Sequence, residues 1–172
     1  ANDMCNRAGI DTISAGTTIA FAIECYENGL ITDKDTDGIK LKWRDSDAVL
    51  KMLDKMIKRE GFGDILADGT KVAAEKIGKG TKNFAMHVGG QEVPMHDPRL
   101  NPGFGTTYVS DPTPGRHTQA GLGYEQMGLA IMNEKLLEKY NLPKKQKKYD
   151  FHTKGKKNAL VSAYGQIINC PG

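Results

Sequence analysis

The segment from Ser46 to Glu60 places apolar residues at helical spacing, and this stripe constrains the fold more than any other feature of the chain. Its apolar positions are Val49, Leu50, Met52, Leu53, Met56 and Ile57. A helix with such a stripe is stable only when another element covers its apolar face. A serine or aspartate cap can start this helix, and Gly61 and Gly63 can end it. We therefore expect a core made of helices that pack against one another.

Other segments before position 94 also carry helix signals. Residues 3–9 can form a short helix that a glycine ends, and Asp11 or Thr12 can cap a buried helix that continues to Glu27. Residues 69–80, with the sequence GTKVAAEKIGKG, predict a further helix with a glycine stop. Together with the stripe helix, these segments predict a helical first half of the chain.

Extended structure is predicted at two places in the same half. The alternation in residues 83–94 is typical of a strand, and residues 30–43 have the pattern of a small hairpin around the acidic turn DKDTDG. Residues 65–66 are expected to form a short turn between helices. The β content of the fold is therefore expected to be minor.

Residues 94–118 contain five of the seven prolines and show neither a helical nor a strand period. A stretch of this length without regular structure is usually disordered or functional, and the aromatic Phe104 and Tyr108 favour an ordered, functional loop. Two more helices are predicted after it, at residues 119–140 and 158–169. The expected fold is mostly α and multihelical, with a minor β-hairpin and two small helical sub-domains. These sub-domains cover residues 1–93 and 94–172 and are joined by the long Pro/Gly-rich loop.

The 172-residue chain has the composition of a water-soluble protein. No apolar run approaches the roughly 20 residues that a membrane helix needs. Cys5, Cys25 and Cys170 form an odd set at spacings that fit no zinc or iron–sulfur motif, so we expect reduced thiols. These features predict a cytoplasmic protein.

Two local motifs suggest binding functions of another class. The run that starts at Asp33 matches the first half of a calcium-binding EF-hand loop, but its twelfth position is Arg44 in place of the closing glutamate. This pattern favours a solvated acidic turn over a calcium site. The segment Lys144–Lys157 holds seven lysines in fourteen residues. Its charge allows an alternative function, a non-catalytic helical module that binds nucleic acid or another polyanion.

The two ends of the chain carry similar polar boxes, NRAGID at residues 6–11 and NCPG at residues 169–172. In each box a polar side chain precedes a glycine by three positions. The first box can present Asn6 and Asp11 around a tight turn at Gly9, and hydrogen-bond acceptors of this kind suit a heterocycle that bears N–H and NH₂ groups. It can equally be the end of one helix and the cap of the next. Both interpretations remain open from the residues alone.

His117 differs from the other histidines because it ends the irregular loop, next to Arg116 and just before a helix can start at Gln119. Such a position combines free backbone N–H groups with a side chain that titrates near neutral pH. His87 is expected to be structural, whereas His96 and His152 are expected at the surface. From the residues alone, His117 can contribute to anion binding or to catalysis, and a role without either function remains open.

Taken together, these segments resemble the tungsten-dependent aldehyde ferredoxin oxidoreductase family, in its two helical C-terminal domains, domains 2 and 3. The resemblance covers nearly the whole chain. It rests on CNRAGIDTISAGTTIAFAIECYENGLIT, TDGIKLKW, DAVLKMLDKMIKREGFGDILADGTKVAAEKIG, FAMHVGGQEVPMHDPR and YVSDPTPGRHTQ, in this order.

In this family, two D-x-x-G-L-(D/C) boxes bind the two pterins of one metal cofactor. The first box here resembles that motif, with Asn6 in the place of the aspartate, followed by Gly9, Ile10 and the final Asp11. The second resembles it from Asn169 to Gly172, so both boxes depart from the motif by an asparagine. An amide offers one acceptor oxygen and no charge, and it cannot make the bidentate contact of a carboxylate. The resemblance thus implies that the two boxes bind the two halves of one cofactor.

The resemblance also implies site residues in the loop before the second box. His117 stands where the family places a histidine close to the metal and the substrate. Thr113 and Gln119 stand where contacts to the pterin are expected, although a basic residue is more usual at both. No residue of the chain is expected to bind the metal directly.

The implied activity is the oxidation of an aldehyde with water to a carboxylic acid. Electrons would pass from a tungsten or molybdenum bis-pterin through a 4Fe–4S cluster to ferredoxin. Members of the family commonly form homodimers, and the resemblance implies neither a nucleic-acid nor a membrane partner. The three-cysteine cluster motif and the fourth cluster cysteine are absent from this sequence. We therefore expect an excised fragment that alone has no cluster, little or no cofactor and no activity.

Overall fold

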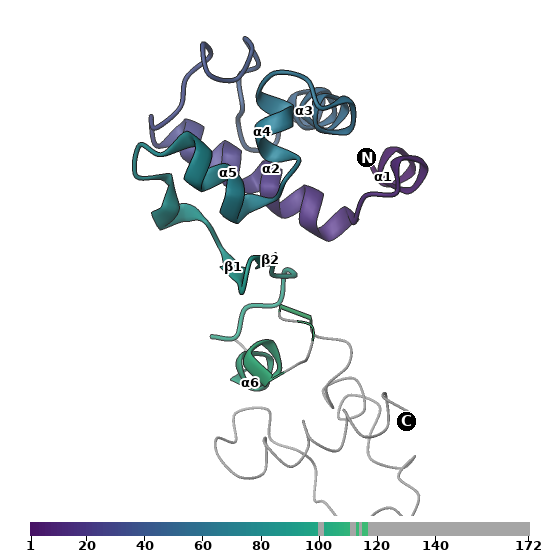
Figure 1. The fold of residues 1–172 in the computed structure, drawn as a ribbon, viewed down its shortest axis with the longest axis vertical. Coiled ribbons are helices and arrows are strands. Elements are labelled where there is room, and N and C mark those ends of the chain that lie inside the picture. Colours follow the sequence, from purple (N-terminus) through teal and green to yellow (C-terminus); the bar gives the residue numbers. More distant parts are fainter. Residues whose placement is uncertain (100–101, 111–112, 114, 117–172) are drawn as a thin grey trace, which may run out of the picture. The chain divides into compact units, whose positions relative to one another are not determined.

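The computed structural model describes residues 1–99, 102–110, 113 and 115–116. These residues form six α-helices, one short 3-10 helix and a two-stranded antiparallel sheet (Figure 1). The elements are α1 (Asn2–Ala8), α2 (Thr12–Glu27), α3 (Ser46–Lys58), α4 (Phe62–Leu66), α5 (Thr70–Ile77), η1 (Thr81–Phe84), β1 (His87–Val88), β2 (Gln91–Glu92) and α6 (Pro102–Ser110). The prediction of a mostly α fold with a minor β-hairpin is confirmed. Within the described part of the chain, none of the helices combines the length and apolar character that a membrane span requires.

The chain divides into two compact units, Ala1–Pro94 and Met95–Gly172. The first unit holds α1 to α5, η1 and the sheet, and the second holds α6. The helices expected at residues 119–140 and 158–169 lie outside the described residues. The two helical sub-domains, 1–93 and 94–172, therefore stay a prediction.

Helix α2 is the centre of the first unit, where it contacts α1, α3, α5, η1 and β2. Its buried side chains are Ala15, Thr18, Ile19, Phe21, Ala22, Ile23 and Cys25. A helix that is apolar around most of its circumference must be covered on several sides, and α2 meets this condition. The other elements contribute Met52, Leu53 and Met56 from α3, Phe62 and Leu66 from α4, and Ala73 and Ala74 from α5. The core expected from the stripe helix is thus formed around α2.

Among the described residues, side-chain caps start the two longest helices, α2 and α3, where the sequence places them. The Asp11 carboxylate accepts a hydrogen bond from the Ser14 N–H at 2.8 Å, and the Asp45 carboxylate accepts one from the Ala48 N–H at 3.0 Å. Helix α3 ends slightly earlier than predicted, because Arg59 adopts a left-handed conformation with a φ of 54°. The short turn expected at residues 65–66 is instead part of helix α4.

The hairpin predicted at residues 30–43 is wrong, because these residues form turns and irregular backbone. Each aspartate of the acidic run binds a different partner: Asp33 accepts from the Tyr26 hydroxyl, Asp35 from the Thr32 N–H and Lys79 Nζ, and Asp37 from the Phe62 N–H and Lys55 Nζ. Such local and long-range bonds to carboxylates stabilise a turn in competition with a strand ladder. The three carboxylates therefore support the fold separately and do not converge on a common point.

The sheet lies later in the chain, where a strand was expected at residues 83–94. In it, His87 pairs with Glu92 and Val88 pairs with Gln91. The two connecting glycines have φ values of 62° and 103°, which glycine adopts without strain in a two-residue hairpin turn. The expected single strand is therefore a hairpin that folds back at Gly89 and Gly90.

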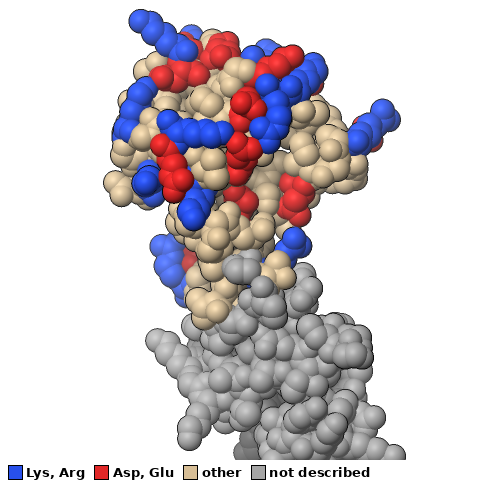
Figure 2. Space-filling model, in the orientation of Figure 1, with Lys and Arg blue, Asp and Glu red and all other residues tan. Residues whose placement is uncertain are grey.

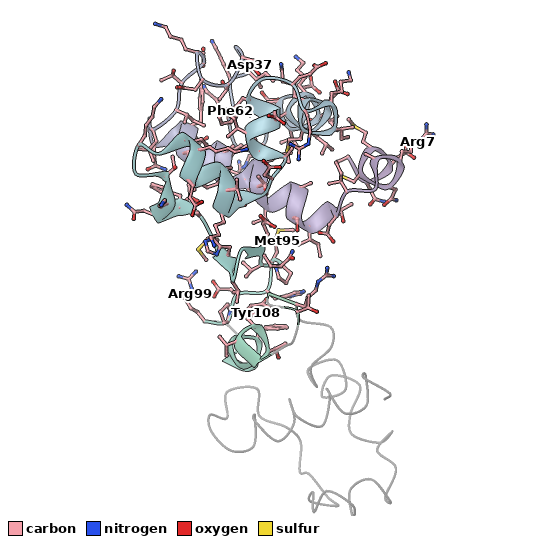
Figure 3. The ribbon with its side chains drawn as sticks, viewed as in Figure 1. Arg7, Asp37, Phe62, Met95, Arg99 and Tyr108 are labelled. Carbon is pink, nitrogen blue, oxygen red and sulfur yellow. The ribbon has the colours of Figure 1, made fainter. Side chains whose placement is uncertain are left out.

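Helix α6 corrects the prediction that residues 94–118 lack regular structure. Pro102 occupies the first helical position, where its fixed φ and missing N–H cost nothing. The buried Tyr108 donates a hydrogen bond from its hydroxyl to the His96 carbonyl at 2.8 Å, and Phe104 stacks on the His96 ring at 4.9 Å. Tyr108 lies on α6, whereas Arg99 belongs to the preceding segment and pairs with Asp97 (Figure 3). The two aromatic residues thus pack α6 against the segment that precedes it.

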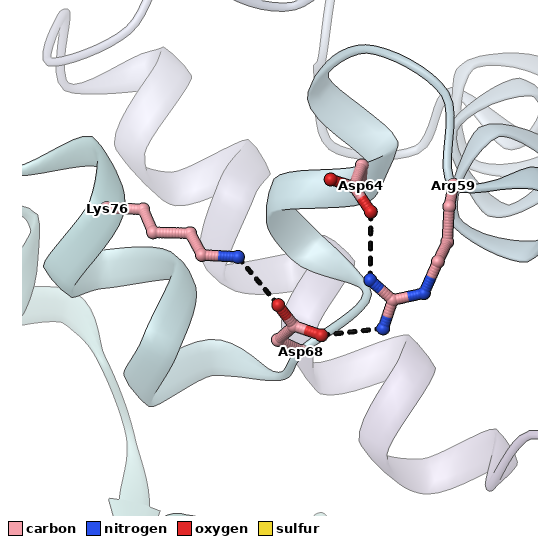
Figure 4. Close-up of polar contacts among 4 residues, drawn as sticks. All are labelled: Arg59, Asp64, Asp68 and Lys76. Carbon is pink, nitrogen blue, oxygen red and sulfur yellow. Dashed lines mark hydrogen bonds and ion pairs between the residues drawn. The ribbon is translucent and has the colours of Figure 1, made fainter.

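An ion network on the surface of the first unit connects three helices (Figure 4). Arg59, at the end of α3, binds Asp64 on α4 at 2.8 Å and Asp68 at 2.6 Å. Lys76 on α5 binds the second carboxylate oxygen of Asp68 at 2.6 Å. The hydrogen bonds from Lys76 and Arg59 lower the pKa of Asp68 from 3.8 to about 2.

The free energy of unfolding is expected to decrease at acid pH because Asp68 and Asp35 become protonated and lose their ion pairs. Lys79 and Thr32 lower the pKa of Asp35 from 3.8 to about 2, as the ion network does for Asp68. A lowered folded-state pKa gives stability that is complete above 3.8 and is lost as the pH falls through about 2. Urea unfolding at a series of acid pH values measures this loss, and Asp68→Asn should flatten the slope. An unchanged slope in that variant would contradict the role of the network.

Candidate functional site

The polar box at residues 6–11, which we call the 6–11 turn, joins α1 to α2. Helix α1 ends with Gly9 in the left-handed conformation, at a φ of 69°. The Ile10 N–H donates to the Cys5 carbonyl at 2.9 Å, and the Gly9 N–H donates to the Asn6 carbonyl at 3.4 Å. This pair of bonds is the Schellman motif of helix ends, and Ile10 packs against the core that includes Cys5. The turn is therefore fixed to α1 and to the core.

Asp11 fixes the other end of the 6–11 turn to α2. Its Oδ1 atom accepts the hydrogen bond from the Ser14 N–H, while the side chain remains exposed. No donor among the described residues binds its second oxygen, Oδ2. One carboxylate oxygen thus caps α2, and the other remains available on an exposed side chain. The helix-cap interpretation is correct for this residue, and it leaves an acceptor for a ligand.

Asn6 lies in the last turn of α1 and is exposed. Its backbone carbonyl takes part in the helix end, but its carboxamide has no hydrogen-bonding partner within the described part of the chain. The neighbouring Arg7 pairs with Asp3 at 3.1 Å and extends outward from α1 (Figure 3). The turn therefore exposes an amide and half of a carboxylate on a backbone that both helices hold in place.

The remaining predicted site residues are distributed differently. Thr113 is half-buried in the second unit, and its carbonyl accepts a hydrogen bond from the Arg116 N–H at 3.3 Å. His117, Gln119, Asn169 and Gly172 lie outside the described residues, as does the lysine-rich segment Lys144–Lys157. Asn6, Gly9, Ile10 and Asp11 are therefore the predicted residues that the structure brings together in one turn.

Sequence reasoning missed the residues in and directly after β2 that contact the first two turns of α2. The Gln91 side-chain amide donates to the Ser14 hydroxyl at 3.1 Å, and the Thr17 hydroxyl donates to the Val93 carbonyl at 3.4 Å. Glu92 is buried beside them. The signal that could have drawn attention to these residues is a glutamate in a segment that otherwise alternates like a half-buried strand.

The described residues offer no metal cluster, and their two cysteines, Cys5 and Cys25, are both buried. Among them, no group of three histidine, cysteine, aspartate or glutamate side chains is arranged to hold a metal ion. Burial, and then the nearby Glu24, raises the pKa of Cys25 to about 11, so its thiol stays protonated at neutral pH. On the face shown in Figure 2, basic and acidic side chains of the first unit are interspersed. The chemistry available at the 6–11 turn is therefore hydrogen bonding to a polar ligand.

Comparisons with known proteins place this turn in a family context. Residues 1–170 match the family model for aldehyde ferredoxin oxidoreductase, domains 2 and 3. A tungsten-containing aldehyde ferredoxin oxidoreductase of Pyrococcus furiosus is 40% identical over 118 residues, which cover 68% of this chain and 19% of that protein. A second protein of Pyrococcus furiosus, named aliphatic sulfonate oxidoreductase, WOR-like subunit, is 39% identical over 95 residues, which cover 53% of this chain and 15% of that protein.

This chain is also similar to a solved structure. The active-site complex BamBC of benzoyl coenzyme A reductase, bound to 1,5-dienoyl-CoA, aligns with a TM-score of 0.52 at 28% identity. The alignment covers 75% of this chain and 22% of that chain. This chain spans about a fifth of the length of the curated aldehyde oxidoreductases that it matches, for example 19% of the Pyrococcus furiosus protein. The match over residues 1–170 shows that this chain belongs to the aldehyde ferredoxin oxidoreductase family, through the region that forms its domains 2 and 3.

Proposed function

We propose that this chain forms part of an oxidoreductase that oxidises aldehydes to carboxylic acids and passes the electrons to ferredoxin. Its part would be to contact a pterin cofactor and to contribute the active-site histidine, His117. The observation that carries the proposal is the family match over residues 1–170, a range that includes the 6–11 turn. The names of the relatives in Pyrococcus support the aldehyde substrate and the ferredoxin acceptor.

The 6–11 turn fits a pterin on chemical grounds. A pterin edge presents N–H and NH₂ donors, and the exposed Oδ2 of Asp11 is an acceptor that the helix cap leaves available. The backbone of the turn is already held by Gly9 and by Ser14. Little ordering is then needed when a ligand binds, because the recognition groups are preorganised. Asn6 would add one amide acceptor and one amide donor.

The roles proposed for the other residues come from the family resemblance. When bound, a tungsten or molybdenum bis-pterin would supply the two-electron oxidation, and a 4Fe–4S cluster would pass the electrons on singly. Asn169 and Gly172 would contact the second pterin, and Thr113 and Gln119 would make further contacts. His117 would hold or transfer the proton at its imidazole, since histidine titrates near neutral pH.

Replacing Asp11 with serine separates its two roles. Serine is a good helix cap, so the free energy of unfolding should change by less than about 0.5 kcal/mol. The carboxylate acceptor is lost, however, and a charge-assisted hydrogen bond is worth roughly 1.5–3 kcal/mol. We expect cofactor affinity to fall about tenfold or more. The tungsten content of the purified holoenzyme, together with the fluorescence of the released pterin, measures the loss.

Asp45→Ser is the matched control for this experiment. Asp45 caps α3 in the same way, through the Ala48 N–H, but it lies outside the 6–11 turn. This variant should keep its full cofactor content. Full cofactor content in Asp11→Ser as well would contradict the proposed role of the turn.

A further inference from the structure

Strand β2 connects the start of α2, the helix that follows the 6–11 turn, to the core through two neighbouring side chains. Consecutive residues of a strand point to opposite faces, so Gln91 and Glu92 reach different elements. Gln91 binds Ser14 in the first turn of α2, and Glu92 binds the N–H of Thr70 at the start of α5. The strand therefore lies between the helix that follows the turn and a second helix of the core.

Glu92 anchors the strand on the core side. Its side chain is only 6% exposed, and its Oε1 atom accepts from the Thr70 N–H at 2.6 Å. A negative charge is stabilised at the N-terminus of a helix such as α5. Gly69 permits this close approach, because a Cβ atom there would lie 2.8 Å from Oε1. The Thr70 hydroxyl is in turn hydrogen-bonded to the Thr18 hydroxyl on α2 at 3.1 Å. The position of β2 is thus set by buried contacts.

Gln91 lies on the other face of the strand, where it hydrogen-bonds Ser14, the residue that Asp11 also binds. Ser14 donates its backbone N–H to Asp11 Oδ1 at 2.8 Å and accepts the Gln91 amide at its hydroxyl at 3.1 Å. The bond from Thr17 to the Val93 carbonyl lies one helical turn further along α2. Ser14 therefore forms hydrogen bonds with both Gln91 and Asp11. Through Gln91, strand β2 contacts the residue that holds the Asp11 carboxylate.

We propose that Gln91 is a positioning residue that, through Ser14, orients the Asp11 carboxylate toward the cofactor. The inference rests on the proposed function, because it assumes that Asp11 binds the pterin. Gln91 itself need not touch the cofactor. Loss of the Gln91 side chain would leave Asp11 as a helix cap but would let the first turn of α2 move. Small displacements of a binding group are enough to weaken recognition.

The test measures the rate at which the holoenzyme releases its tungsten cofactor. Gln91→Ala should raise this rate about fivefold, and Ser14→Ala should do the same because it removes the same bond from the helix side. The double variant should release the cofactor no faster than either single variant. Ser14→Thr keeps a hydroxyl at this position and should therefore release the cofactor as slowly as the unchanged holoenzyme. Because Ser14→Ala leaves the strand untouched, the test does not depend on the stability of the Gln91 variant.

The decisive measurement repeats Gln91→Ala in the Asp11→Ser background, where the carboxylate is already absent. Gln91→Ala should then have no further effect on release. Thr36→Val serves as the stability control, because it removes a buried hydroxyl that bonds the Ile39 carbonyl at 2.7 Å, beyond the opposite end of α2. It should lower the midpoint of thermal unfolding without accelerating release.

The outcomes separate the two proposals. If Asp11→Ser accelerates release and Gln91→Ala does not, the positioning role is overturned and the proposed function stands. If Gln91→Ala accelerates release equally in both backgrounds, its role is structural and the inference is overturned. If Asp11→Ser does not change the rate of cofactor release, the proposed binding role of the 6–11 turn is overturned, and the positioning role of Gln91 that rests on it is overturned as well.

Discussion

Gly63→Ala is expected to lower the free energy of unfolding by about 3 kcal/mol, at the upper end of the usual cost of overpacking a core. Gly63 is buried in α4, where this helix packs against α3. A Cβ atom at this position would lie 2.6 Å from the Lys55 carbonyl oxygen and nearer still to its carbonyl carbon. Because the obstacle is backbone, no side-chain rotation relieves the clash. The two helices would have to separate.

Gly16→Ala is the matched control for Gly63→Ala. Gly16 also lies within a helix, α2, but a Cβ atom there would meet nothing within 4 Å. Alanine should therefore stabilise the chain by about 0.5–1 kcal/mol, since glycine is a poor helix former. Urea unfolding followed by far-ultraviolet circular dichroism measures both variants. Equal stability of Gly63→Ala and the unchanged chain would contradict the close packing of α3 and α4.

His117→Ala is expected to reduce turnover of the holoenzyme by about 10²-fold or more, if His117 transfers the proton. The reason is chemical, because alanine removes a group whose ordinary pKa of about 6.5 suits both the donation and the acceptance of a proton near neutral pH. The pH dependence of turnover should also lose the limb that this histidine causes. Steady-state rates with an aldehyde substrate and a chemical electron acceptor measure both effects.

His96→Ala is the control for that experiment. His96 is an exposed histidine whose ring stacks on Phe104, and nothing assigns it to the reaction. Its replacement should leave turnover and the pH profile unchanged. Added imidazole should partly restore the rate of His117→Ala but not alter that of His96→Ala. An unchanged rate in His117→Ala would remove His117 from the mechanism.

The parts of the fold that the sequence predicts well depend on neighbours within one helical turn. Asp11 and Asp45 each cap a helix by binding an N–H three residues ahead, and Gly9 ends α1 through its own backbone conformation. Such signals need no information about the rest of the chain. They place the start of α2 and α3 and the turn between α1 and α2.

The failed predictions concern segments whose structure depends on distant residues. Residues 39–43 alternate like a strand because Ile39 and Leu41 reach the core from an irregular loop, while Trp43 is 51% exposed. A period of two indicates only an extended backbone, and a strand also needs a hydrogen-bonding partner. Here Asp35 binds Lys79 and Asp37 binds Phe62, far along the sequence, so turns replace the ladder.

Helix α6 was missed for a different reason. Two of its residues are glycines, which weaken the helical signal, and a proline such as Pro102 is typical of a loop, although here it stands at the first helical position. Its stability comes from packing, through the buried Tyr108. No local pattern in the sequence reveals that contact.

The candidate site was predictable only in part. The 6–11 turn follows from its own residues, whereas the contact between Gln91 and Ser14 joins positions 77 residues apart. The same holds for the bond between Glu92 and Thr70, which spans 22 residues. These two contacts depend on how α2, α5 and the sheet pack, and local patterns in one sequence do not predict them.

Positions 6 and 11 tolerate mutation unequally. Asp11 starts the central helix, whereas the Asn6 carboxamide has no hydrogen-bonding partner in the part of the chain that the structure describes. A change at position 6 alters the proposed recognition surface, whereas most changes at position 11 also weaken the cap of the helix around which the core is built. Divergence of this domain toward other ligands should therefore begin at position 6.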